Sequence, residues 1–133
     1  MKKLMILGST SNICKIRVFN NLNNLDLFDI IYCYGCENWN TNHDNISSKI
    51  KFIKGNYNID SYKENLTNLV SDNTIIYVAT PPICYIDILN YFNSINKNYK
   101  LILEKPLAKN INEFKNIKFL ISNKVILCDH FIF

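Results

Sequence analysis

The chain has no apolar run near the roughly 20 residues that a membrane-spanning helix needs, and its first apolar run ends at Gly8. We therefore expect neither a membrane span nor a secretory signal, and we interpret the protein as cytoplasmic. A strong basic excess is also missing, because the formal net charge is only +4 and the lysines are scattered along the sequence. This pattern argues against a nucleic-acid-binding protein.

The cysteines are odd in number, five in all, which does not favour a disulfide framework in a cytoplasmic chain. Cys33 and Cys36 form a C-x-x-C pair, but a structural zinc site needs four ligands and the nearest further candidate, His43, stands alone. We therefore expect no metal site. Cys33 lies inside an apolar run typical of a strand, whereas reactive thiols are favoured at helix N-termini, so we interpret it as a buried structural cysteine.

What the chain does contain is enough apolar sequence for one core. Hydrophobic residues make up 48% and charged residues 20% of 133 residues, which is typical of a single folded domain. Short apolar runs alternate with segments of helical character, the pattern of βαβ units. The predicted strands are residues 3–7, 29–34, 49–53, 74–79, 100–103 and 125–128, and the predicted helices are residues 13–22, 61–69, 84–93 and 112–120.

These strands are apolar on both faces, as in a parallel sheet covered by helices on each side. The predicted fold is therefore α/β, a Rossmann-type doubly wound, mainly parallel sheet in three α/β/α layers, forming one domain over residues 1–133. Asp60 is the predicted N-cap of the second helix, and Pro81 and Pro82 precede the third.

The junction after the first strand has the position of a phosphate-binding turn. In a Rossmann unit, backbone N–H groups at this turn and the following helix N-terminus face a pyrophosphate, and small residues allow close approach. A single glycine followed by hydroxyl residues is equally consistent with an ordinary capped turn. The residues concerned are Gly8, Ser9, Thr10, Ser11, Asn12 and Ile13.

Three further groups of residues follow predicted strands and would meet at the same carboxyl edge. They are the Thr80-Pro81-Pro82 turn, the Glu104-Lys105-Pro106 segment and the Asp129-His130 pair. Lys105 can hold a substrate hydroxyl or phosphate as a point charge, and His130 can bind a phosphate. The alternative interpretations are a stiffened connection, a solvated ion pair and a polar strand end.

In their order and spacing these segments resemble the N-terminal domain of glucose-6-phosphate dehydrogenase. That family has Gly-Ala-Ser-Gly-Asp-Leu at the first turn, a Gly-Asn/Asp segment ending in Tyr that resembles residues 55–62, and Leu-Ala-Leu-Pro-Pro where this chain has residues 78–82. Its Glu-Lys-Pro matches residues 104–106, and its Asp-His-Tyr resembles residues 129–131.

The resemblance implies that Gly8 to Ile13 cradle the pyrophosphate of NADP, with Tyr85 and Lys105 also near the cofactor. It further implies that Lys105 contacts a sugar phosphate, that His130 binds its phosphate group and that Asp129 orients a catalytic histidine. In that chemistry the histidine takes the proton of the C1 hydroxyl while hydride passes from C1 to the nicotinamide, a step of the pentose phosphate pathway.

Several departures from the family pattern affect these expectations. The family's histidine base belongs to a substrate domain that we expect to be absent here, so the chain is incomplete as a catalyst on its own. Ser11 replaces the second glycine, and the arginine that pairs with the 2′-phosphate aligns near Gly35, so NAD is an alternative to NADP.

Two other interpretations remain open. Ala79-Thr80-Pro81 and residues 104–108 also suit the glucose-fructose oxidoreductase and inositol dehydrogenase family, whose N-terminal domains share this fold. The chain could instead be a non-enzymatic remnant or interaction module with the same fold. The apolar residues 131–133 predict self-association or a subunit that completes the enzyme.

Overall fold

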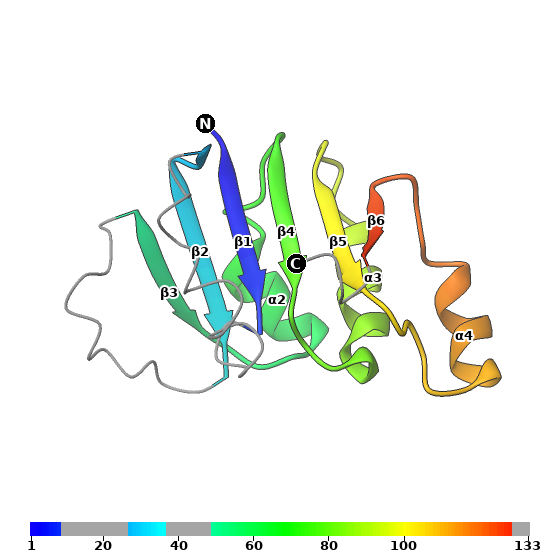
Figure 1. The fold of residues 1–133 in the computed structure, drawn as a ribbon. Coiled ribbons are helices and arrows are strands. Elements are labelled where there is room, and N and C mark those ends of the chain that lie inside the picture. Colours follow the sequence, from blue (N-terminus) through cyan, green and yellow to red (C-terminus); the bar gives the residue numbers. More distant parts are fainter. Residues whose placement is uncertain (9–26, 37–48, 129–133) are drawn as a thin grey trace.

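The computed structural model describes residues 1–8, 27–36 and 49–128. Within them six strands form one parallel sheet in the order β3-β2-β1-β4-β5-β6 (Figure 1). The strands are β1 (Lys3–Leu7), β2 (Ile30–Gly35), β3 (Ile50–Lys54), β4 (Thr74–Val78), β5 (Lys100–Glu104) and β6 (Val125–Cys128).

This strand order is the Rossmann order. The chain runs outward from β1 to β3, then returns to the other side of β1 and continues from β4 to β6. The order reverses between β1 and β4, and ligands of open α/β sheets bind at such a switch point, outside the carboxyl ends of the strands. The predicted doubly wound α/β fold is therefore confirmed.

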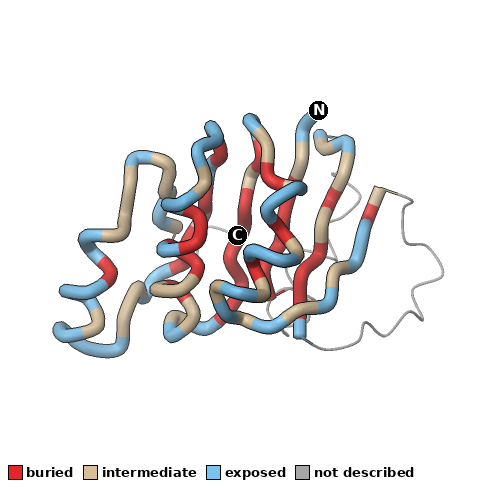
Figure 2. The backbone as a smooth tube through the Cα atoms, turned by 180° about the vertical axis from the view of Figure 1, so that it is seen from behind, coloured by how far each residue is buried: buried red, intermediate tan, exposed pale blue. Residues whose placement is uncertain are grey.

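Of the three α-helices in the described residues, the first two cover one face of the sheet and the last lies beside the edge strand β6 (Figures 1 and 2). They are α2 (Ile59–Leu66), α3 (Tyr85–Asn93), which follows the short 3-10 helix η2 (Pro82–Cys84), and α4 (Ile111–Lys118). The helix predicted over residues 13–22 lies outside the described residues. None of the helices in the part of the chain just listed is long and apolar enough to cross a membrane.

Strands β1 and β6 have the predicted bounds, and the other four differ from the prediction by one residue at one or both ends. The predicted N-cap of α2 is wrong, because Asn58 rather than Asp60 precedes the helix. Asn58 has extended backbone angles and its side chain accepts a hydrogen bond of 2.9 Å from the Ser61 amide, whereas Asp60 lies in the first turn.

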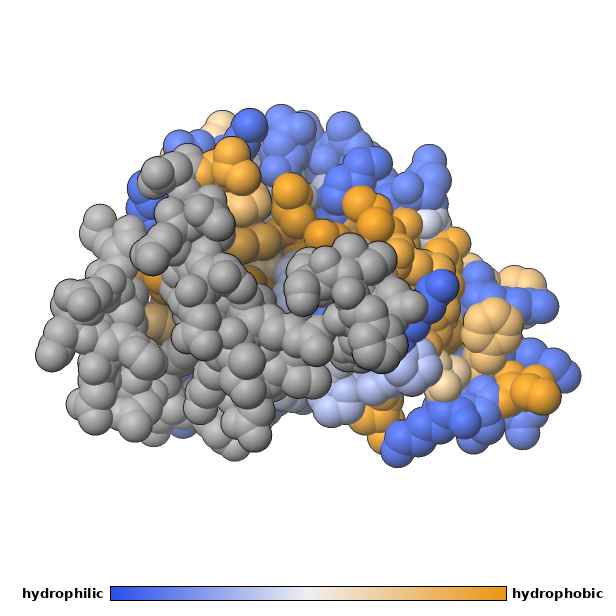
Figure 3. Space-filling model, in the orientation of Figure 1, coloured by the Kyte–Doolittle hydropathy of each residue, from blue (hydrophilic) through white to orange (hydrophobic). Residues whose placement is uncertain are grey.

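The core lies on both faces of the sheet. Along β1, Met5 and Leu7 face the helices while Leu4 and Ile6 point to the opposite side, as the alternation of a strand requires. In the view of Figure 3 this second side shows hydrophobic residues across the middle, below a hydrophilic band along the amino edge. The second cluster consists of Leu4, Ile6, Ile31, Cys33, Ile50, Tyr77 and Ala79.

Cys33 is fully buried in β2, which confirms the structural interpretation of this thiol. Cys36 follows the strand and is exposed, so the two thiols of the C-x-x-C pair have different environments.

Candidate functional site at the carboxyl edge of the sheet

Gly8 directly follows β1 at the switch point and has a backbone conformation that favours glycine. Its φ is +84°, and its amide donates a hydrogen bond of 2.9 Å to the Tyr34 carbonyl of β2. A Cβ atom placed on Gly8 would lie 2.9 Å from the carbonyl carbon of Ala79 and 3.0 Å from Cγ2 of Thr80. Gly8 therefore lets the backbone just after β1 approach the end of β4 closely.

The end of β4 leads into α3 through a compact connection at the same edge. Ala79 is paired to β1 by a hydrogen bond of 2.7 Å from its amide to the Leu7 carbonyl, and Thr80 is buried. Pro81 then opens the turn, and its carbonyl accepts a hydrogen bond of 3.0 Å from the Cys84 amide. The segment that follows β4 beside Gly8 thus consists of small residues and a turn stiffened by proline.

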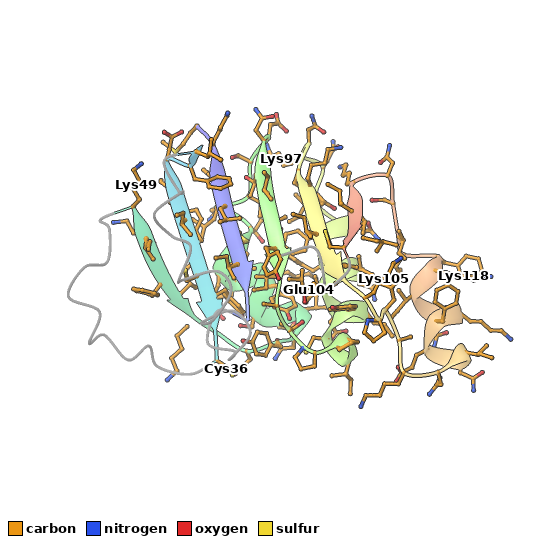
Figure 4. All side chains as sticks on the ribbon, viewed as in Figure 1. Cys36, Lys49, Lys97, Glu104, Lys105 and Lys118 are labelled. Carbon is orange, nitrogen blue, oxygen red and sulfur yellow. The ribbon has the colours of Figure 1, made fainter. Side chains whose placement is uncertain are left out.

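Glu104 and Lys105 stand at the end of β5. Figure 4 labels them next to each other at the carboxyl edge, with Lys49 and Lys97 at the opposite edge of the sheet. Glu104 is buried, whereas Lys105 is exposed. The Lys105 amide donates a hydrogen bond of 2.9 Å to the Cys128 carbonyl, and the Lys105–Pro106 peptide bond is cis. An exposed ammonium therefore lies on the same edge as the glycine turn.

Two tyrosines contact Glu104. The Tyr77 hydroxyl, from β4, donates a hydrogen bond to Oε1 of Glu104. The Tyr85 hydroxyl, from the first turn of α3, donates a hydrogen bond of 2.9 Å to the Glu104 carbonyl oxygen. Burial, with the charge of Glu104 as a smaller cause, raises the pKa of Tyr85 to about 12. The Tyr85 hydroxyl therefore remains protonated and able to donate at neutral pH.

The segment from Gly55 to Tyr62, which carries part of the family resemblance, has a structural role here. A Cβ on Gly55 would lie 2.6 Å from Cζ of Tyr34, so the glycine makes room for that ring. The Tyr34 hydroxyl contacts the Asn56 carbonyl and, at 2.7 Å, Oγ of Ser61. This segment fixes the connection from β3 to α2, and it does so beside β2 at the carboxyl edge.

The structure brings Gly8 and Lys105 to one edge of the sheet, as the parallel arrangement predicts. It places the Tyr85 ring in the core, with its hydroxyl on Glu104, so its predicted nearness to a cofactor stays a prediction. The remaining predicted site residues, Ser9, Thr10, Ser11, Asn12, Ile13, Asp129 and His130, lie outside the described residues.

Tyr77 was not among the residues that the sequence singled out. Apart from Thr74 its strand is otherwise apolar. A buried tyrosine hydroxyl usually needs a hydrogen-bond partner, so this residue could have been identified as half of a buried pair. Its partner could not, since Tyr77 and Glu104 are 27 residues apart.

The described part of the edge fits a dinucleotide phosphate. The turn at Gly8 lies in close contact with the end of β4 at the switch point, and a side chain there would fill the space. A pyrophosphate or sugar phosphate also needs a positive charge close to it, and the exposed ammonium of Lys105 supplies that charge.

Comparison with known proteins agrees with this geometry. The family model described as the NAD-binding domain of glucose-6-phosphate dehydrogenase matches residues 33–131. A search of curated proteins found no match. Among solved structures, glucose-6-phosphate 1-dehydrogenase from Mycobacterium avium superposes with a TM-score of 0.75 at 13% identity, covering 98% of this chain and 36% of that one.

Two more solved structures are similar. A glucose-6-phosphate dehydrogenase in complex with its substrate glucose-6-phosphate has a TM-score of 0.72 at 16% identity and is covered over 36% of its length, by 97% of this chain. The myo-inositol 2-dehydrogenase of Lactobacillus plantarum has a TM-score of 0.60 at 16% identity, with 98% of this chain on 36% of that one. At these identities the structures share the fold, and this chain spans little more than a third of their length.

Proposed function

Because the chain belongs to the family of glucose-6-phosphate dehydrogenase NAD-binding domains, we propose that the carboxyl edge of its sheet binds NADP for oxidation of a sugar phosphate. The observation that supports this most is the glycine turn at the switch point, which a Cβ would obstruct, on the same edge as an exposed lysine. A bound nicotinamide dinucleotide supplies the hydride acceptor.

In this proposal the predicted site residues have the following roles. Gly8 and the residues that follow it, Ser9 to Ile13, present backbone amides to the pyrophosphate, and Lys105 supplies positive charge to the cofactor and to the sugar phosphate. His130 binds the phosphate of the sugar, and Asp129 orients the base. Apart from His130 the sequence contains only His43, so the base comes from a substrate domain or from another polypeptide.

We propose NADP ahead of NAD on the family resemblance, although the arginine that pairs with the 2′-phosphate is replaced here. β2 ends in Gly35, and the next residue, Cys36, is exposed. Neither side chain can pair with a 2′-phosphate, so we expect the preference for NADP to be small.

Calorimetric titration of the purified chain with NADP and NAD tests the proposal. We expect saturable binding that Lys105→Ala weakens by about tenfold, since a charge-assisted contact to phosphate is lost. Lys118→Ala is the matched control, because Lys118 is a lysine on α4 whose ammonium lies 5.0 Å from the centre of the Phe119 ring. Absence of heat with both dinucleotides at millimolar concentration contradicts the proposal.

We also keep the expectation that the chain self-associates or binds a completing subunit. The apolar residues 131–133, which are predicted to form this surface, lie outside the described residues, and Ile126 and Leu127 of β6 are 45% and 41% exposed. Sedimentation velocity at high concentration tests it, and a monomer at all concentrations contradicts it.

A further inference from the structure

Glu104 is held from both faces of the sheet. Its side chain is on the same face as that of Ile102, two residues earlier, and accepts a hydrogen bond from Tyr77 of the second core cluster. Its main-chain carbonyl accepts a hydrogen bond from Tyr85, which belongs to the main core cluster between sheet and helices. The two tyrosines therefore approach one residue from opposite sides.

The anchoring extends to the next residue. The Lys105 amide is bonded to the Cys128 carbonyl of β6 at 2.9 Å, so the peptide between Glu104 and Lys105 has one hydrogen bond on its carbonyl and one on its N–H. Rotation of this peptide would break both bonds and would also disturb the buried carboxylate. The Cα atom of Lys105 is thus fixed while its side chain stays exposed.

From this arrangement we propose that Tyr77 and Tyr85 are positioning residues that hold Lys105 in place for binding a phosphate group of the dinucleotide. The inference rests on the proposed function and adds to it the residues that prepare the lysine. A lysine side chain has four flexible carbons. When its Cα atom is already fixed, fewer conformations are lost as the ammonium binds a phosphate.

Tyr77→Phe removes only the hydroxyl on Glu104 and tests the proposal by a double-mutant cycle with Lys105→Ala. The measured quantity is the dissociation constant of NADP. We expect Tyr77→Phe to weaken binding about three- to tenfold in the wild-type background, the loss of one hydrogen bond. In the Lys105→Ala background it should have almost no effect, since the positioned group is gone. Equal losses in both backgrounds, or no loss at all, overturn the proposal.

The matched control is Tyr99→Phe. Tyr99 is also a buried tyrosine, and its hydroxyl donates a hydrogen bond of 2.6 Å to the Phe92 carbonyl, but it precedes β5 and so lies at the amino edge. It should leave NADP affinity unchanged in both backgrounds. Tyr85→Phe is the second variant. If Tyr77→Phe does not fold, the double-mutant cycle of Tyr85→Phe with Lys105→Ala should show the same loss of NADP affinity only in the wild-type background.

Hydrogen exchange of the ligand-free protein gives a readout that does not depend on the cofactor. We expect Tyr77→Phe and Tyr85→Phe to speed exchange of the Lys105 amide, while Tyr99→Phe does not. An unchanged Lys105 amide in both variants overturns the positioning role. If wild-type protein binds neither NADP nor NAD, the proposed function fails, and this exchange experiment still decides whether the tyrosines fix Lys105.

Discussion

Replacing Gly8 by alanine is the perturbation for which the structure gives the clearest magnitude. A non-glycine residue at a φ of +84° is strained by about 1–2 kcal/mol, and the contacts of 2.9 and 3.0 Å with Ala79 and Thr80 add about 1–3 kcal/mol of overpacking. Alanine restricts the unfolded chain and so returns about 0.4–1 kcal/mol. We expect a net destabilisation of about 1–5 kcal/mol.

Urea unfolding followed by circular dichroism measures this effect. With a slope near 2 kcal/mol per molar, the Gly8→Ala midpoint should fall by about 0.5–2.5 M relative to the wild type. Adding Thr80→Ser removes the Cγ2 methyl group that a Cβ would meet at 3.0 Å, and it should restore only part of the loss, because the Ala79 backbone stays in place. A Gly8→Ala midpoint within about 0.2 M of the wild type would show that a Cβ at Gly8 causes neither strain nor crowding.

Three further effects should be measurable. Gly55→Ala should cost about 1–3 kcal/mol in urea unfolding, because its Cβ displaces the Tyr34 ring, and NADP affinity should change less than with Gly8→Ala; the opposite ranking would contradict the structural role of Gly55. Asn58→Ala should cost about 1 kcal/mol by loss of the α2 cap, whereas Asp60→Asn should have little effect. The pKa of Tyr85 is raised from 10.0 to about 12, so its contribution to stability is complete below pH 10 and is lost as the pH rises through 12; a circular dichroism titration showing constant stability over that interval would contradict this.

Much of the fold could be predicted because the strands are short apolar runs separated by polar connections. β1 and β6 were predicted to the residue. The start of α2 could not be, since Asn58 and Asp60 are both good capping residues and only the backbone angles decide between them. The end of α2 could not be predicted either, because Leu69 continues the apolar spacing although the helix ends at Leu66.

The site was predictable where it depends on strand direction alone. Gly8 and Lys105 follow strands of one parallel sheet, so both had to lie at its carboxyl edge. The contact between Tyr77 and Glu104 depends on register as well. Tyr77 is paired with Ile102, which brings Glu104 within reach two residues further along β5, and nothing in either strand's own sequence gives that alignment.

The proposed function requires that the carboxyl edge between β1 and β5 binds a nicotinamide dinucleotide. Titration of isotope-labelled protein with NADP, followed by amide chemical shifts in two-dimensional NMR, tests it most directly. We expect the largest shifts at Gly8, Thr80 and Lys105, with Lys97 at the opposite edge unchanged. Shifts centred on the amino edge, or none at saturating NADP and NAD, would contradict it.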